Sequence, residues 1–414
     1  MKSILTIFTG LIVTGCLLSA QEARLLNHEF LSKLRTEAAR THPSIVSAKH
    51  LATAASHDSR AVRLWEDPMV GLGFMVADKM MRMEDGDIAI GIEQTLPKPG
   101  MFEARRLKAE AMQRAASENS RTWAITVAAE AARNAIELAL ADESITLQQT
   151  QITWLTATVE NARQMAASPM GSSSDALRME IELAKEQQML DAARRSRDGF
   201  AQRLNLTLGR ALDSPWPALK LPATPPPVPL ARAEIARIPH ANPKVRSMME
   251  MAGAAKAETH MADRERLPEV SIGIDTRLYA SGSDVRNTMV GVKMTLPWFN
   301  DTSYQAAISA ARSRELSASQ NVETMRREVA TMVLSAATEA ANAAAQARAY
   351  SGEIHEKALL TNKAIQAAWI SSKAPLNDLL TSSRALFSIR LEQRRMIAMQ
   401  LAALEELQTL VPNR

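Results

Sequence analysis

Apolar residues alternate with small or polar residues in four short segments of the chain. These segments are residues 68–77, 87–96, 268–279 and 287–296. In the first, Val70, Leu72 and Phe74 are separated by glycines. Alternation with a period of two predicts strands with one apolar face, and the polar connectors between partners predict two β-hairpins. Each strand is close to the 9–11 residues that a tilted strand needs to cross a bilayer.

After each hairpin the pattern changes to helical spacing. Residues 101–168 contain no glycine or proline, and residues 298–374 are interrupted only by Gly352. At about 1.5 Å per residue, a helix over residues 100–168 would be on the order of 100 Å long. The predicted helices are residues 31–65, 100–168, 175–208, 245–266, 299–370 and 377–410.

Prolines and glycines recur at a fixed offset of 200 residues, as 297 − 97 shows for Pro97 and Pro297. The other pairs at this offset are Pro43 and Pro243, Pro68 and Pro268, Gly73 and Gly273, and Gly91 and Gly291. Five landmarks in one register without a gap indicate a duplicated unit. The first repeat then spans residues 21–213 and the second spans residues 230–414. The proline-rich residues 214–229 connect them as an extended strap.

The N-terminus predicts export. One lysine, an apolar run too short to span a membrane and small residues form a secretory signal over residues 1–20. The order Val13-Thr14-Gly15-Cys16 is similar to the lipobox of bacterial lipoproteins, in which the signal ends at residue 15 and Cys16 is lipidated. The alternative is cleavage after Ala20, which removes Cys16. Since this is the single cysteine, no disulfide within the chain can form.

Composition favours long helices. The 414 residues are 46% hydrophobic but only 4% aromatic, and the net charge is +4 with both signs interspersed. Without a basic stripe, we expect no nucleic-acid binding. The sequence contains no nucleophile–base constellation, Walker loop or dinucleotide fingerprint, so we expect no enzyme activity and no cofactor.

Strand arithmetic predicts an oligomer. Four strands cannot close a barrel, and unpaired strand edges are not tolerated in lipid. Barrels of about eight strands are filled by side chains, whereas three copies of this chain supply twelve strands and room for an aqueous lumen.

Over residues 31–410 the chain resembles the TolC-like outer-membrane efflux factors. The duplicated helix–hairpin–long helix–helix order carries the resemblance, together with the exits EQTLPKPG and TLPWF and the Asp378–Leu380 segment. The resemblance implies a mainly α fold with a small β part, in a homotrimer with a 12-stranded outer-membrane barrel and a 12-helix periplasmic tunnel. Pro97 and Pro297 would lie where strands become tunnel helices.

The resemblance also implies a function and partners. The chain would be a passive export duct that docks to a periplasmic adaptor and to an inner-membrane pump of the resistance-nodulation-division type. The EQTLPKPGMFEAR exit is similar to the heavy-metal branch, so a metal cation is the expected cargo. Drug efflux and type I protein secretion are alternatives, and a periplasmic adaptor or coiled-coil scaffold without a barrel is an alternative of another class.

Two carboxylates are candidate gate residues. Asp378 matches the family position after the turn that joins the two long helices of the second repeat, and Asp175 occupies the comparable place in the first repeat. Repeated around a threefold axis, such carboxylates would steer cations and respond to protonation. The alternative interpretation is a helix cap, because acids are favoured at helix N-termini. The turn residues Pro169, Gly171, Ser371 and Pro375 are the candidate adaptor contacts.

The first hairpin connector contains Met80, Met81 and Met83, and the chain has 22 methionines. Thioether sulfur is a soft ligand suited to Cu(I). Methionine is also a common gap-filler, so these residues are weak metal candidates and we expect no resident metal site.

Overall fold

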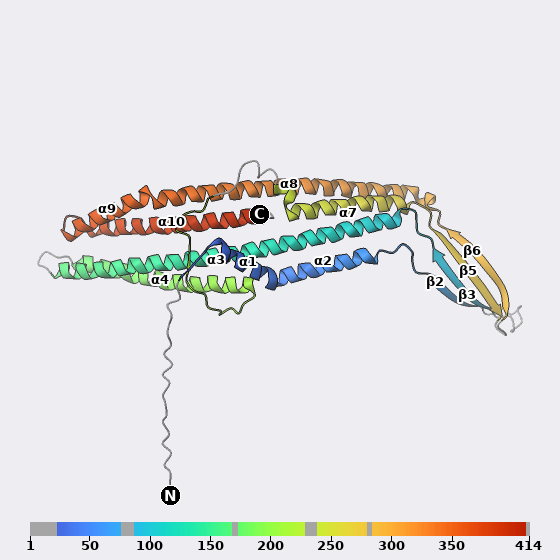
Figure 1. Cartoon of the computed structure of the whole chain (residues 1–414), viewed down its shortest axis with the longest axis horizontal. Coiled ribbons are helices and arrows are strands. Elements are labelled where there is room, and N and C mark those ends of the chain that lie inside the picture. The colour runs from blue at the N-terminus through green and yellow to red at the C-terminus, as the bar shows by residue number, and fades with distance from the viewer. Residues whose placement is uncertain (1–22, 76–86, 168–172, 228–237, 280–283, 411–414) are drawn as a thin grey trace, which may run out of the picture.

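The computed structural model describes residues 23–75, 87–167, 173–227, 238–279 and 284–410. It is an elongated, mostly helical molecule with a four-stranded sheet at one end (Figure 1). The first repeat contains α1 (His28–Thr41), α2 (Pro43–Ala61), β2 (Met69–Met75), β3 (Asp87–Thr95), α3 (Met101–Ala166) and α4 (Ser173–Leu208). The second contains α6 (Ile238–Ala241), α7 (Pro243–Glu265), β5 (Val270–Tyr279), β6 (Val285–Met294), η1 (Pro297–Asn300), α8 (Asp301–Ser351), α9 (Glu353–Ile370) and α10 (Leu376–Leu410).

The long helices form one layer, four helices wide. In the half beside the sheet, α3 packs on α2 and α7, and α7 packs on α8. In the other half, α3 packs on α4 and α10, and α10 packs on α8 and α9. Thus α3 runs through both halves, while α2 and α4 follow one another along one free edge of the layer and α8 and α9 follow one another along the other (Figure 1).

The sheet has the order β2-β3-β5-β6 and is antiparallel throughout. Strands β3 and β5, one from each repeat, pair at its centre, so the duplicated hairpins form one continuous sheet. Strands β2 and β6 are its outer strands and have a neighbour on one side only among the described residues.

Proline positions divide the helices that precede the hairpins. The single helix expected over residues 31–65 is two helices, because Pro43 lacks the N–H that would continue α1. The His42 ring caps α2 by accepting a hydrogen bond from Ser44 N–H at 3.3 Å. In the second repeat, the Asn242 side chain caps α7 before Pro243 in the same way.

The helix expected over residues 299–370 is also divided. Helix α8 ends at Ser351 and α9 begins at Glu353, because the backbone at Gly352 leaves the helical region (φ −96°, ψ −123°). Glycine lowers the cost of such a break, since it has the weakest helix propensity after proline.

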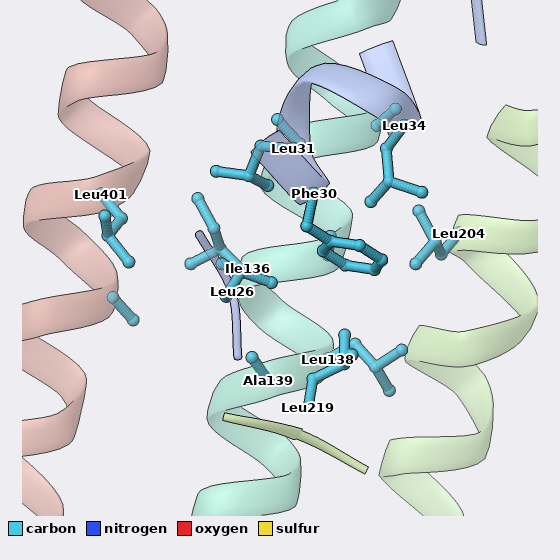
Figure 2. Close-up of a cluster of buried hydrophobic side chains, with 14 of the residues drawn as sticks. Leu26, Phe30, Leu31, Leu34, Ile136, Leu138, Ala139, Leu204, Leu219 and Leu401 are labelled. Carbon is cyan, nitrogen blue, oxygen red and sulfur yellow. The ribbon is translucent and has the colours of Figure 1, made fainter. Parts of the chain in front are cut away.

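The largest apolar core lies at mid-length, where α1 covers α3 and α4. Figure 2 shows Phe30 and Leu34 of α1 directed toward Leu138 and Leu204 of α3 and α4. Leu138 and Leu204 are fully buried. Truncating either side chain to alanine should cost about 2–5 kcal/mol.

The described part of the connector, residues 214–227, crosses this core as a strap. Its short strand β4 (Leu219–Lys220) pairs in parallel with β1 (Arg24–Leu25). Arg197 of α4 donates to the Trp216 carbonyl at 3.0 Å, and Gln400 of α10 donates to the Pro226 carbonyl at 2.5 Å. The strap therefore spans the layer from the first repeat to the second.

Candidate functional sites

One face of the sheet is apolar and open to its surroundings. The side chains on this face form rows across the strands, such as Val70–Ile92–Ile274–Val290. Leu72 and Phe74 on the outer strand β2 are 71% and 78% exposed. Large apolar side chains exposed in a contiguous patch mark an interface with another apolar phase or another chain.

The opposite face of the sheet carries mostly glycines and polar side chains, together with Met69, Met75 and Met289. Lys293 of β6 reaches across β5 to the carboxylate of Glu93 on β3, with a distance of 2.5 Å between Nζ and Oε2. Ser271 of β5 also donates to Glu93, at 2.6 Å. The charged side chains Glu93, Asp275 and Lys293 thus lie on one face, whereas the other face is mostly apolar apart from Gln94, Thr276 and Thr288. The lipid and lumen faces of a barrel differ in the same sense.

The strands and the long helices meet at a short junction. Pro97 lies between β3 and α3, and Pro297 begins η1 between β6 and α8. Gly100 enters α3 with φ of +77°, a conformation that favours glycine, and the Arg264 side chain lies over it. Trp298 and Phe299 on η1 are exposed.

The far end of the layer carries the candidate gate residues. Asp175 and Asp378 lie in the first turns of α4 and α10, which begin at the same end of the molecule (Figure 1). Asp378 is exposed and Asp175 is partly exposed. Neither carboxylate has a hydrogen-bond or ion-pair partner among the described residues, so within that part of the chain neither caps its helix through its side chain. Their position is also the one that a helix dipole favours for an acid.

The turn between α9 and α10 contains two of the candidate adaptor contacts, Ser371 and Pro375. Ser371 ends α9, and its side chain donates to the carbonyls of Ala367 and Ala368 at 3.0 Å. Pro375 precedes α10 and is exposed. Beneath it, Leu376 and Leu379 pack with residues of α3 and α4 in one apolar cluster.

An ion pair between α4 and α10, close to this end of the layer, joins the two repeats. Arg384 of α10 donates to the carboxylate of Glu182 on α4, at 2.8 Å from Nε and 2.6 Å from Nη2. Since α3 lies between these helices, the pair bridges across it. Glu186, one turn along α4, has a buried carboxylate oxygen without a hydrogen bond. Burial and the neighbouring charge of Glu182 raise the pKa of Glu186 above its ordinary value.

Several candidates lie outside the described residues: Cys16, Met80, Met81, Met83, Pro169 and Gly171. Within the described part of the chain, no helix combines the length and hydropathy needed to cross a membrane. The described side chains also contain no cluster of three or more His, Cys, Asp or Glu that could hold a metal ion.

Comparison with solved structures identifies the architecture. The outer-membrane channel OprN has a TM-score of 0.81 and 14% identity, over 93% of this chain and 90% of that one. CusC, solved in a study of folding and transmembrane channel formation, has a TM-score of 0.80 and 15% identity, over 92% of this chain and 91% of that one. The outer membrane protein VceC from Vibrio cholerae has a TM-score of 0.79 and 14% identity, over 92% and 96%.

The chain shares the fold of OprN, CusC and VceC. The expected fold class, mainly α with a small β part, is confirmed. No protein-family model and no curated protein matches the sequence. The likeness to the three solved structures, at 14–15% identity, therefore establishes the fold alone.

Sequence reasoning missed the Glu182–Arg384 bridge and the contacts of the strap. The bridging residues are 202 positions apart, and their helices become neighbours only through packing on α3. Two acids one turn apart on a helix, Glu182 and Glu186, were the available signal, but such pairs are common on solvated helix faces.

Proposed function

We propose that the chain is the outer-membrane channel of a tripartite efflux system, a passive duct fed by a periplasmic adaptor and an inner-membrane pump. The observation that carries the proposal is the two-faced sheet with open outer strands at one end of a long helix layer. An apolar face suits lipid, a polar face suits a lumen, and unpaired edges in lipid require partners. The shared fold with known outer-membrane channels supports the same assignment.

The proposed assembly is a homotrimer. Three four-stranded sheets joined β2 to β6 give twelve strands, which leave space for water at their centre. The helix layer is four helices wide in both halves, so three layers joined along their free edges give a tunnel of twelve helices. The exposed apolar residues of the free edges, such as Leu177 and Ile181 on α4 and Leu360 on α9, support contacts between protomers.

The proposed cargo is a heavy-metal cation, supplied by a pump of the resistance-nodulation-division type. Support comes from the exit EQTLPKPGMFEAR, which is similar to that of the metal branch. Disrupting the gene in its host should sensitise growth to silver or copper salts more than to amphipathic drugs. The reverse order of sensitivity would indicate that the channel exports drugs rather than metal cations, with the same architecture.

At the periplasmic end, we propose that Asp378 and Asp175 face a narrow aperture and that the adjoining turns contact the adaptor. At the N-terminus, we propose that lipidation of Cys16 anchors the mature chain. Mass spectrometry of the mature N-terminus separates the two processing routes, because only lipidation leaves a diacylglyceryl-modified Cys16 as the first residue.

Cysteine cross-linking tests the strand pairing between protomers. In a Cys16→Ser background, one cysteine in β2 (Val70, Leu72 or Phe74) is combined with one in β6 (Val290 or Val292). Pairing of β2 with β6 of the next copy predicts a covalent ladder that ends at three chains on a non-reducing gel.

The matched control places cysteines at Ile90 and Thr276, which are partners within one sheet. This pair should cross-link within the chain and produce no ladder. A ladder that passes beyond three chains, or its absence for every β2–β6 combination in folded protein, would contradict the trimeric barrel.

A further inference from the structure

A small pocket opens at the junction between the sheet and the helices. Its volume is about 220 Å³, and residues from the segment after α2, the start of α3 and the end of α7 line it. Leu64, Met101, Phe102 and Tyr304 supply its apolar wall. Arg105, Lys98, Glu66 and Glu269 supply charges of both signs.

The pocket lies on the apolar side of the sheet. Gln94 alternates in phase with Ile90 and Ile92 on β3, so it belongs to the apolar face. Its amide donates to the Glu66 carbonyl at 2.9 Å, which places the segment that carries Leu64 and Glu66 on that face. The pocket therefore reaches the end of the apolar rows, where the proposed membrane boundary falls, and Thr95 and Glu269 close it from the side of the polar face.

The charged groups of the pocket have spare bonding capacity. The only partner of the Arg105 guanidinium among the described residues is the Glu66 carboxylate, 4.0 Å away, so none of its five N–H groups makes a hydrogen bond there. Lys98 donates to the Glu265 carbonyl at 3.3 Å and lies 3.8 Å from the Glu269 carboxylate. The Lys98 side chain is only 18% exposed, whereas that of Glu269 is 47% exposed. Donors and acceptors for a further group thus lie side by side.

The fold of the junction does not require these residues. At the offset of 200, the second repeat has Trp298 where the first has Lys98, and Gln305 where the first has Arg105. Both junctions form a strand exit followed by a helix, but only the junction after β3 carries this pair of cations. One such pocket in each protomer gives three in the proposed trimer.

We propose that this pocket binds the phosphoethanolamine headgroup of a membrane phospholipid. The phosphate would accept hydrogen bonds from Arg105 and Lys98, and the primary ammonium would donate to the Glu66 and Glu269 carboxylates. An anionic headgroup would satisfy only the cations and leave carboxylates facing negative charge. The acyl chains would run along the apolar face of the sheet. This inference rests on the proposed membrane location, which it deepens by naming a lipid class.

Lipid titration of the purified, delipidated trimer by native mass spectrometry tests the assignment. The probes are phosphatidylethanolamine, phosphatidylglycerol and phosphatidylcholine with identical acyl chains. We expect up to three tightly retained phosphatidylethanolamine molecules per trimer, and about tenfold or greater weakening in Arg105→Met and in Glu269→Gln. The matched control is Arg106→Met, because Arg106 pairs with Glu110 at 2.7 Å and does not line the pocket.

Three results would overturn the inference: equal retention of the three lipids, preference for phosphatidylglycerol or phosphatidylcholine, or equal weakening by Arg106→Met. Channel conductance of the same preparations separates this inference from the proposed function. Normal conductance with no lipid preference defeats the headgroup site alone, whereas protein that neither trimerises nor conducts defeats the proposed function.

Discussion

Replacing Asp142 with alanine removes the carboxylate that holds the strap on the helix layer. Asp142 of α3 is buried, and it accepts hydrogen bonds from Arg197 Nε at 2.7 Å and from the Leu219 backbone N–H at 2.8 Å. The first bond ties α4 to α3, and the second fixes strand β4. The variant leaves both donors without this acceptor.

The expected cost follows from the burial of the pair. Removing one partner of a buried ion pair costs about 3–5 kcal/mol. The Arg197 side chain is 21% exposed, and it keeps its hydrogen bond to the Trp216 carbonyl in the variant. The loss of stability should therefore be at the lower end of this range, about 3 kcal/mol. Because about 1.4 kcal/mol corresponds to a tenfold change, the strap should open roughly 100-fold more often.

Hydrogen exchange of the Leu26 amide measures this opening. That amide donates to the Lys220 carbonyl at 2.8 Å and does not contact Asp142, so it reports release of the strap rather than loss of its own acceptor. The control is Asp191→Ala, which removes an exposed pair with Arg194 at 3.4 Å and should change exchange little. Acceleration of less than about threefold in Asp142→Ala would show that Asp142 does not hold the strap on the helix layer.

Three further predictions address the sheet and the helix end. Leu72→Arg puts a charge on the proposed lipid face and should destabilise the inserted barrel by about 2–4 kcal/mol at mid-bilayer, measured by urea-induced release from vesicles; no change in the midpoint would contradict a lipid-facing position. Lys293→Met removes the cation that faces Glu93 on the proposed lumen face and leaves only the hydrogen bond from Ser271. The variant should shift the reversal potential in a salt gradient toward cation selectivity, whereas an unchanged potential would place this face outside the lumen. Because the pKa of Glu186 is raised, the contribution of this group to stability is present at low pH and is lost as the pH rises through that pKa. The melting temperature of Glu186→Gln should therefore equal that of wild type at pH 4 and exceed it at pH 8. Equal melting temperatures of the two proteins at both pH values would contradict this.

Local pattern predicts the hairpins and the long helices, although it misses the breaks at Pro43 and Gly352. Alternation around Val70 and Ile90 reflects a sheet with two unlike faces, and the absence of glycine and proline in residues 101–168 permits one long helix. Pro43 and Pro243, which lie at the 200-residue offset, both stand at the first position of a helix.

Contacts between distant segments could not be predicted from one sequence. The strap was expected as a connector, but its clamp by Asp142 and Arg197 depends on how α4 packs against α3. The pocket at the junction likewise combines Arg105 and Glu269, which are far apart in the chain and meet only where the sheet joins the helices. The first-turn position of Asp378 suits either a cap or a gate, and the sequence could not show that its carboxylate makes no capping hydrogen bond among the described residues.

Single-channel recording in a planar bilayer tests the central claim, that three copies enclose an aqueous duct. Purified wild-type protein and Asp378→Ala are recorded side by side at neutral and acidic pH, with trimer content measured in the same detergent. A trimeric duct with a carboxylate aperture predicts stable, cation-preferring conductance, with larger conductance and weaker pH dependence in Asp378→Ala. Folded trimer that conducts in neither form, even with Asp175→Ala added, would contradict it.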